Sequence, residues 1–158
     1  MADYTGKYFS QRDLSLLHSF NNELITNVMQ IVVELLKVAP GETKTNIYGE
    51  TDQTAGRYYF EPIKLACIID RGDISSEDYN FGPDRKQTAV FKFQEDVLQS
   101  VNFYPQNGDL ITFNERYYEI DNITQEQMIG GQPDKSWSII CNTHYTRFSK
   151  VNIIDRQN

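Results

Sequence analysis

Few residues in this chain could take part in nucleophilic chemistry. Among its 158 residues the only histidines are His18 and His144, and the only cysteines are Cys67 and Cys141. A cysteine nucleophile needs a general base beside it, and Cys141 and His144 are the nearest pair in the sequence. They lie three positions apart in a predicted strand, 137–148, so their side chains should point to opposite faces. We therefore expect no Cys–His dyad.

Metal and cofactor sites are not predicted either. Both cysteines lie in apolar runs, where a reduced thiol acts as a small hydrophobic side chain, and no second histidine stands at ligand spacing from His144. The tripeptide Arg71-Gly72-Asp73 could be an adhesion motif, but glycine and aspartate are also what a polar turn needs. We predict a protein that is not an enzyme and has no cofactor. A small hydrolase using His144 is the weakest alternative.

Composition narrows the classes of partner. The chain has 15 Lys and Arg against 22 Asp and Glu, a net charge of −7, which disfavours general binding to nucleic-acid phosphates or anionic lipids. The first eleven residues lack the layout of a signal peptide, and Asn27, Gln30 and Glu34 interrupt the apolar stretch that follows. We expect one domain and no membrane segment.

One long helix is predicted near the N-terminus. Ser10 and Asp13 resemble a capping box, and apolar residues recur at steps of three and four until Ala39-Pro40-Gly41. A second apolar row makes the apolar face of this helix wider than one core needs. Either the helix lies in a groove of its own domain, or neighbouring subunits cover the second row. That second row comprises Leu16, Ile25, Met29, Val33 and Leu36.

The residues after Gly41 are rich in the β-branched and aromatic types that are typical of strands. We expect a mainly β (α+β) fold, an antiparallel β-barrel or sandwich with one long N-terminal helix. Residues 1–45 would form the extension and helix, and residues 46–158 the body. Residues 70–86 read as an exposed loop with a binding task and residues 130–134 as a plain hairpin connection. The expected strands are 57–69 with Pro62 at an edge or bulge, 87–94, 110–113, 117–120 and 137–148, with a helical turn at 95–101.

An ordered set of motifs resembles the neck proteins of contractile-tailed bacteriophages, which join the portal vertex to the tail. The resemblance covers residues 46 to 153. Its motifs are Asn46-Ile47-Tyr48-Gly49-Glu50, Phe81-Gly82-Pro83-Asp84-Arg85, Phe103-Tyr104-Pro105-Gln106-Asn107-Gly108-Asp109-Leu110-Ile111, Tyr117-Tyr118-Glu119-Ile120-Asp121-Asn122 and Ile139-Ile140-Cys141-Asn142-Thr143-His144-Tyr145.

The resemblance implies a structural virion protein without a catalytic residue. It would form a homo-oligomeric ring, with a hexamer as one candidate, around a DNA channel that it does not bind specifically. Its partners would be portal-side or adaptor connector proteins and tail-terminator or tail-side proteins, and its location the virion neck after assembly in the host cytoplasm. The predicted interface residues are Leu16, Ile25, Met29, Val33, Leu36, Arg71, Asp84, Arg85, Asn142 and His144.

A non-enzymatic binding module is the main alternative. Exposed aromatic residues could stack sugars or single-stranded bases, although such binders combine aromatic residues with positive charge that this chain lacks. Packing inside the sheet is the simpler role for these side chains. They are Tyr58, Tyr59, Phe60, Phe103, Tyr104, Tyr117 and Tyr118.

Overall fold

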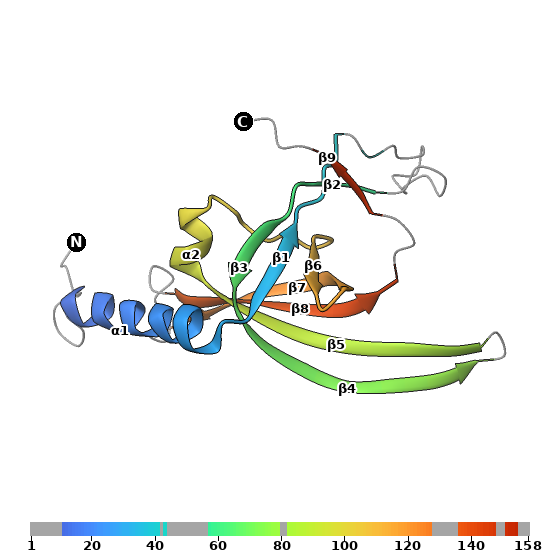
Figure 1. Cartoon of the computed structure of the whole chain (residues 1–158), viewed down its shortest axis with the longest axis horizontal. Helices are drawn as coiled ribbons and strands as arrows, with labels where there is room; N and C mark the ends of the chain where they lie inside the picture. The colour runs from blue at the N-terminus through green and yellow to red at the C-terminus, as the bar shows by residue number, and fades with distance from the viewer. Residues whose placement is uncertain are drawn as a thin grey trace.

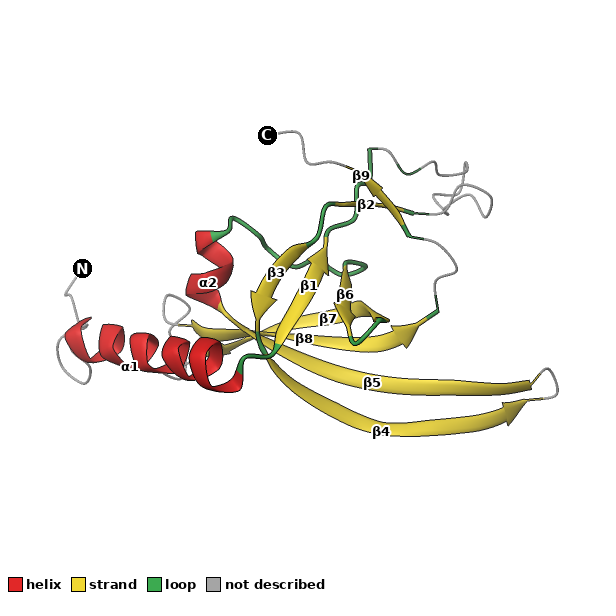
Figure 2. Ribbon diagram, viewed as in Figure 1, coloured by secondary structure: helices red, strands yellow, loops and turns green. Residues whose placement is uncertain are grey.

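The computed structural model describes residues 11–41, 43, 57–79, 82–127, 136–147 and 151–154. The fold is mainly β, with short helical segments at one end (Figures 1 and 2). The helices are α1 (Gln11–Glu23), the π-helix η2 (Leu24–Met29) and α2 (Glu95–Ser100). The strands are β1 (Val32–Leu36), β2 (Tyr58–Phe60), β3 (Ile63–Ala66), β4 (Ile68–Tyr79), β5 (Gly82–Gln94), β6 (Leu110–Phe113), β7 (Arg116–Gln127), β8 (Ser136–Thr146) and β9 (Asn152–Ile154).

Seven strands form one antiparallel sheet in the order β3-β1-β6-β7-β8-β5-β4. Its two edge strands, β3 and β4, are consecutive in the chain and are separated by Cys67 alone. The backbone N–H of Cys67 donates a hydrogen bond of 3.0 Å to the carbonyl of Ile31, just before β1. The sheet therefore curls until its two edges meet at Cys67. A separate parallel pair, β2 and β9, lies beside it (Figure 1).

The core fills the inside of the curled sheet. Inward-facing residues alternate with outward ones along each strand, as in Phe91 and Phe93 of β5, which are buried while Val90 is only partly covered. Helix α2 places Leu98 against this core, and Phe103 follows it. Other large side chains of this core that are fully buried include Val33, Leu35, Ile111, Tyr118 and Ile120.

The prediction of one long helix is wrong for its second half. The helix ends at Met29, and Gln30 adopts a left-handed conformation with φ of 52° while its N–H caps the carbonyl of Ile25. Residues 32–36 form β1, which pairs with β3 on one side and β6 on the other. Val33 and Leu35 both face the core. Pairing on both sides outweighs the helical spacing of the apolar residues.

The predicted loop at residues 70–86 is also wrong. Its residues extend β4 and β5 into a long hairpin paired from Ile68↔Lys92 to Tyr79↔Gly82. The predicted strand 57–69 is divided instead, since Pro62 separates β2 from β3 and Cys67 separates β3 from β4. A ribbon that lies outside the core needs no apolar alternation, so its polar composition resembled that of a loop.

Other elements are confirmed. Strand 87–94 lies within β5, the helical turn at 95–101 matches α2, and β8 covers most of 137–148. Asn114 and Glu115 connect β6 and β7 with φ of 50° and 61°, the left-handed pair that a tight hairpin turn requires. The predictions at residues 46–50 and 130–134 lie outside the described residues.

Candidate assembly interface

The outer part of the β4–β5 hairpin extends away from the sheet. Strand β5 pairs with β8 only from Thr88 to Gln94. Beyond that point, residues 74–79 of β4 pair with residues 82–87 of β5 and with no other strand among the described residues. We call this two-stranded ribbon the arm; it projects past the body in Figure 1. An isolated two-stranded ribbon is marginally stable in water, so the arm gains from a surface to lie against.

A glycine lets the arm leave the sheet. The register of β4 and β5 shifts between Arg71 and Ile74, and Gly72 lies in this bulge. A Cβ atom added at Gly72 would lie 2.6 Å from Oγ1 of Thr88 and 3.2 Å from its carbonyl oxygen. A side chain at position 72 would force Thr88 to shift, so glycine favours this close approach of the two strands. The crossing over Thr88 accounts for the glycine of the Arg71-Gly72-Asp73 tripeptide.

Side chains of the opposite strands hold the root of the arm, which we call the arm base. The guanidinium of Arg71 lies 4.7 Å from the centre of the Phe113 ring on β6. The buried Gln87 accepts hydrogen bonds at Oε1 from Arg116 Nη1 (3.2 Å) and from the Tyr118 hydroxyl (3.4 Å). The root of the hairpin is therefore fixed to β6 and β7, while the arm beyond it is free of the sheet.

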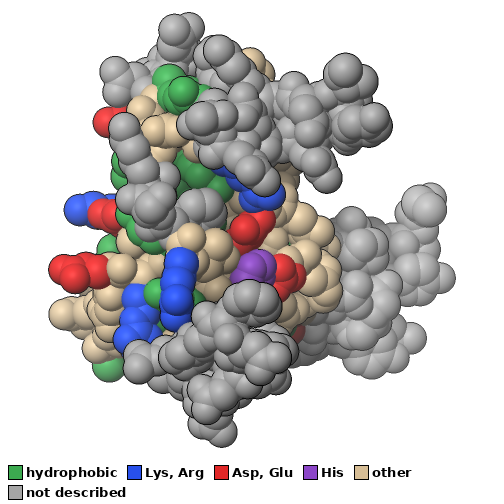
Figure 3. All heavy atoms as spheres, turned by 90° about the vertical axis from the view of Figure 1, so that its right-hand side faces the viewer, with side chains coloured by type: hydrophobic (Ala, Val, Ile, Leu, Met, Phe, Trp, Pro, Cys, Tyr) green, Lys and Arg blue, Asp and Glu red, His purple; other side chains and the backbone are tan. Residues whose placement is uncertain are grey.

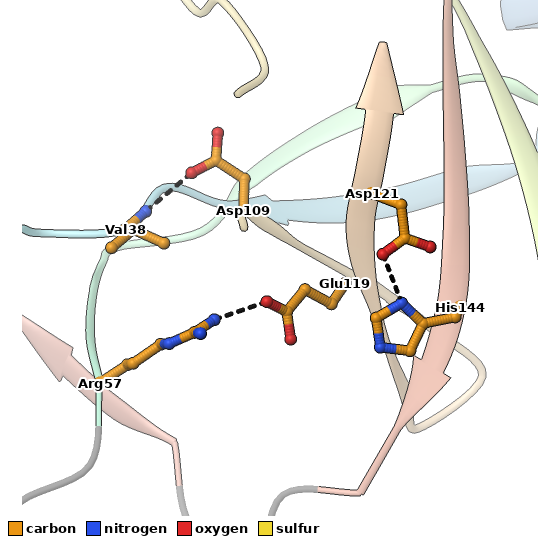
Figure 4. A network of polar contacts seen from close by, with 6 residues as sticks. All are labelled: Val38, Arg57, Asp109, Glu119, Asp121 and His144. Atoms are coloured by element: carbon orange, nitrogen blue, oxygen red, sulfur yellow. Dashed lines mark hydrogen bonds and ion pairs between the residues drawn. The ribbon is translucent and has the colours of Figure 1, made fainter. Parts of the chain in front are cut away.

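A polar layer joins β7, β8 and the segment before β2 (Figure 4). Arg57 Nη1 and Glu119 Oε1 are 2.5 Å apart, and this hydrogen bond raises the pKa of Arg57 above its ordinary value. His144 Nδ1 lies 2.7 Å from Oδ1 of Asp121. The register of β7 against β8 shifts between Ile120 and Asn122, so Asp121 is the residue of a bulge that lies next to His144. The layer consists of the Arg57–Glu119 ion pair and the His144–Asp121 hydrogen bond, both partly exposed.

Asp109 organises the chain entering β6. It is 1% exposed, and its carboxylate accepts hydrogen bonds from the backbone N–H of Val38 (2.9 Å) and of Gln106 (2.8 Å). Burial raises the pKa of Asp109 above its ordinary value, although both hydrogen bonds oppose that shift. This carboxylate ties the end of β1 to the loop before β6, which is a structural role.

Helix α1 is attached to the body through one side. His18 Nδ1 lies 2.8 Å from Oδ2 of Asp96 on α2, and its ring packs 5.5 Å from the ring of Trp137 on β8. Ile25 of η2 is buried. These contacts fix which face of the helix meets the sheet.

The other face of α1 and η2 carries exposed apolar side chains. Leu16 is 68% exposed, Phe20 65% and Val28 74%. With the partly buried Leu24 they recur every four residues and form one ridge along the helix. We call Leu16, Phe20 and Val28 the apolar ridge. Leu17 and Met29, beside it, are also exposed. Apolar clusters of this kind on a surface mark interaction sites.

The predicted interface residues divide into groups. Ile25, Val33 and Leu36 are buried in the chain's own core, which corrects their assignment to a subunit interface. Ile25 is buried as the groove alternative expected, whereas Val33 and Leu36 are buried as residues of strand β1, outside the helix. Leu16 and Met29 remain exposed at the helix end.

The predicted residues on the strands lie toward the arm. Arg71 is exposed at the arm base, while Asn142 and His144 are partly buried on the outer face of β8. Asp84 and Arg85 belong to the β5 part of the arm, but their side chains lie outside the described residues. The sequence predicted one set of interface residues. The structure separates this set into two groups, because the helix and the arm project from opposite ends of the molecule (Figure 1).

Several interface candidates were missed from the sequence. Phe20 of α1 and Arg116 at the start of β7 were not among the predicted interface residues. The four-residue spacing of Leu16, Phe20, Leu24 and Val28 was a usable signal for the ridge. The pairing of Arg116 with Gln87 carried no signal, since these residues are 29 positions apart.

The residues considered for catalysis are not assembled. Cys141 is fully buried in the core, whereas His144 lies on the opposite face of β8 beside Asp121. Burial raises the pKa of Cys67 and of Cys141 to about 12, which leaves both thiols protonated at neutral pH. In the described part of the chain, histidine, cysteine and acidic side chains do not gather into a group of three that could hold a metal ion.

The aromatic residues considered for stacking are mostly packed. Tyr59, Phe103 and Tyr118 are buried, and Tyr118 makes edge contacts with Phe91 and Tyr145. Tyr58, Phe60 and Tyr117 are partly covered, and of the seven only Tyr104 is largely exposed. These positions do not form a row of exposed rings.

No helix within the described residues is long and apolar enough to cross a membrane. The chain matches no protein-family model, and the search of curated proteins finds no match.

Proposed function

We propose that this chain is a structural subunit of the neck of a contractile-tailed bacteriophage. It would form a ring between the portal and the tail around the DNA channel and would be needed for head completion and head–tail joining. Its motifs at residues 103–111, 117–122 and 139–145 resemble neck proteins, and they fall in the loop before β6, in β7 and in β8.

The observation that carries the proposal is the pair of projections on a body that already has a filled core. The arm leaves the sheet at Gly72, and the apolar ridge faces away from it. Neither feature is needed to complete the described core. Protruding ribbons and exposed apolar helix faces suit a subunit that becomes stable among neighbours.

We propose further that the curled sheet is the barrel of the ring body. Its edges, β3 and β4, meet at Cys67, and Arg71 of β4 reaches Phe113 of β6 across one end. A net charge of −7 suits a wall along which DNA passes without being held. The ring would contact connector proteins on the portal side and tail proteins below.

Head–tail joining in a phage that carries this chain is the direct test. Heads and tails made without the chain should stay separate, and the purified chain should restore joined particles and plaques. A variant with residues 75–86 replaced by Asn-Gly should stay folded, because the arm lies outside the core, yet should fail to join them.

The matched control is Gln125→Ala, an exposed substitution on β7 of the body. It should join heads and tails as the unaltered chain does. Normal joining by the arm-deleted chain, or normal phage assembly without the chain, would refute the proposal.

A further inference from the structure

Both strands of the arm have an outer edge that lacks a partner strand among the described residues. Residues 74–79 of β4 pair only with residues 82–87 of β5, and β5 pairs with β8 only from Thr88 to Gln94. The backbone groups along each outer edge could therefore bond a further strand. Because a ribbon of two strands is marginally stable in water, a third strand would stabilise it. The arm is suited to strand addition.

The charges of the arm are not matched across its own two strands. In the register of the hairpin, Arg85 and Lys86 stand opposite serines, whereas Glu77 stands opposite Asp84. Opposite charges directly across a strand pair stabilise it, and like charges destabilise it. No acid of the arm stands directly opposite one of its bases. Both kinds of charge are therefore left for a strand from outside.

The two sides of the arm differ in charge. On the β4 side, residues 70–79 include four acids and one base. On the β5 side, the sheet continues with β8 and β7, where Arg116 Nη1 reaches Gln87 Oε1 at 3.2 Å and Arg147 follows β8. With Glu115 beside Arg116, this side has four bases and two acids. Figure 3 views the molecule from the side toward which the arm projects and shows Lys and Arg side chains gathered there.

We propose that neighbouring copies of this chain join their arms into one sheet. The β4 edge of one copy would pair antiparallel with the β5 edge of the next. One register sets Lys86 opposite Glu77 of the neighbouring copy and Arg85 opposite its Asp78. In that register Lys86 also lies beside the like-charged pair of Glu77 and Asp84, which the arm alone leaves uncompensated. A second copy therefore supplies the charges that each edge lacks.

Contacts between two like edges fit less well. Two β4 edges would bring acidic residues together, which like charges disfavour. Two β5 edges can set Asp84 of each copy opposite Arg85 of the other, but this contact uses the same edge twice and ends with a pair of subunits. Only a contact of unlike edges continues from subunit to subunit. The choice against a β5 pair rests on the proposed function, because a ring needs a contact that continues.

Two charge-reversal variants and their mixture test the contact. Glu77→Lys/Asp78→Lys puts bases on both strands of the arm, and Arg85→Glu/Lys86→Glu puts acids on both. In light scattering, each variant alone should self-associate about tenfold or more weakly than the unaltered chain, because two attractive charge pairs become repulsive. Mixing the variants should restore association, since the edges that meet then carry opposite charges.

The matched control is Glu23→Lys/Glu61→Lys, which makes the same change in net charge at two exposed positions outside the arm. It should self-associate as the unaltered chain does. Both arm variants should also unfold in urea as the unaltered chain does, because the arm lies outside the core.

Three outcomes would overturn the inference. Weaker association of Arg85→Glu/Lys86→Glu with no change in Glu77→Lys/Asp78→Lys would indicate the pair of β5 edges. A mixture that associates no better than its components would remove the contact of unlike edges. So would an unaltered chain that stays monomeric at every concentration.

The result is separable from the test of the proposed function. Unchanged association of both variants with intact head–tail joining would show that subunits of a working neck protein meet through other surfaces. Restored association in the mixture, without any role of the chain in joining heads to tails, would keep the contact and remove the neck assignment.

Discussion

Replacing Asp109 by alanine should destabilise the fold strongly. Its carboxylate satisfies the backbone N–H groups of Val38 and Gln106, at 2.9 and 2.8 Å, in a place where the residue is 1% exposed. A buried donor left without a partner costs about 1 to 3 kcal/mol, so two donors predict a loss of about 2 to 6 kcal/mol. Asp109→Asn keeps one acceptor oxygen and should lose about 1 to 3 kcal/mol.

Urea unfolding followed by circular dichroism measures these losses. Asp121→Ala is the matched control, because it also removes a hydrogen-bonded carboxylate, but one on the exposed surface beside His144. It should change the unfolding free energy by less than about 1 kcal/mol. An Asp109→Ala variant as stable as the control would refute the assigned role of the buried carboxylate.

The pH dependence supplies a second readout of Asp109. Burial raises its pKa in the folded chain above the ordinary 3.8, so the folded state holds this proton more tightly than the unfolded state. The corresponding stabilisation is complete below the unfolded pKa and is lost as pH rises through the folded pKa. The unaltered chain should therefore gain stability relative to Asp109→Asn as pH is lowered from neutral toward 4. A relative loss would mean that the two hydrogen bonds, not burial, dominate.

Three further outcomes follow from the contacts. Gly72→Ala should destabilise the chain by about 1 to 3 kcal/mol through its clash with Thr88, and a Thr88→Ala background should relieve part of this loss in urea unfolding. His18→Ala should speed amide hydrogen exchange in α1 far more than in the sheet, because it removes two contacts that hold α1 on the body. Cys67 and Cys141 should react with a thiol reagent only as fast as the chain opens, so quick labelling under native conditions would contradict their burial.

Strands with one buried face were predictable because the local pattern and the tertiary environment agree there. Along β5, Phe91 and Phe93 alternate with polar or partly exposed residues, and the turn at Asn114 and Glu115 fits two closely spaced strands. The pattern failed at 32–36, where Val33, Leu35 and Leu36 continue a helical spacing. Residues 32–36 form a strand instead of a helix because β1 makes backbone hydrogen bonds to β3 and to β6.

The candidate interface was only partly predictable for a related reason. The apolar row of the helix was visible in the sequence, but the sequence did not say which side the body would cover. The contacts of His18 with Asp96 and Trp137 set that orientation, leaving Phe20 outside and Ile25 inside. Residues 70–86 were predicted as an exposed loop, whereas the structure extends the hairpin through them by pairing along the whole of β4 and β5.

By itself, the sequence determined the strand-rich composition, the acidic charge, the two apolar rows and the thin supply of catalytic side chains, since these depend on residue type and short spacing. Only the tertiary structure decided where the helix stops, that β3 and β4 meet at Cys67, and that the ridge and the arm project from opposite ends. The physical reason is that strand pairing and burial join residues far apart in the chain, and their free energy outweighs local propensity.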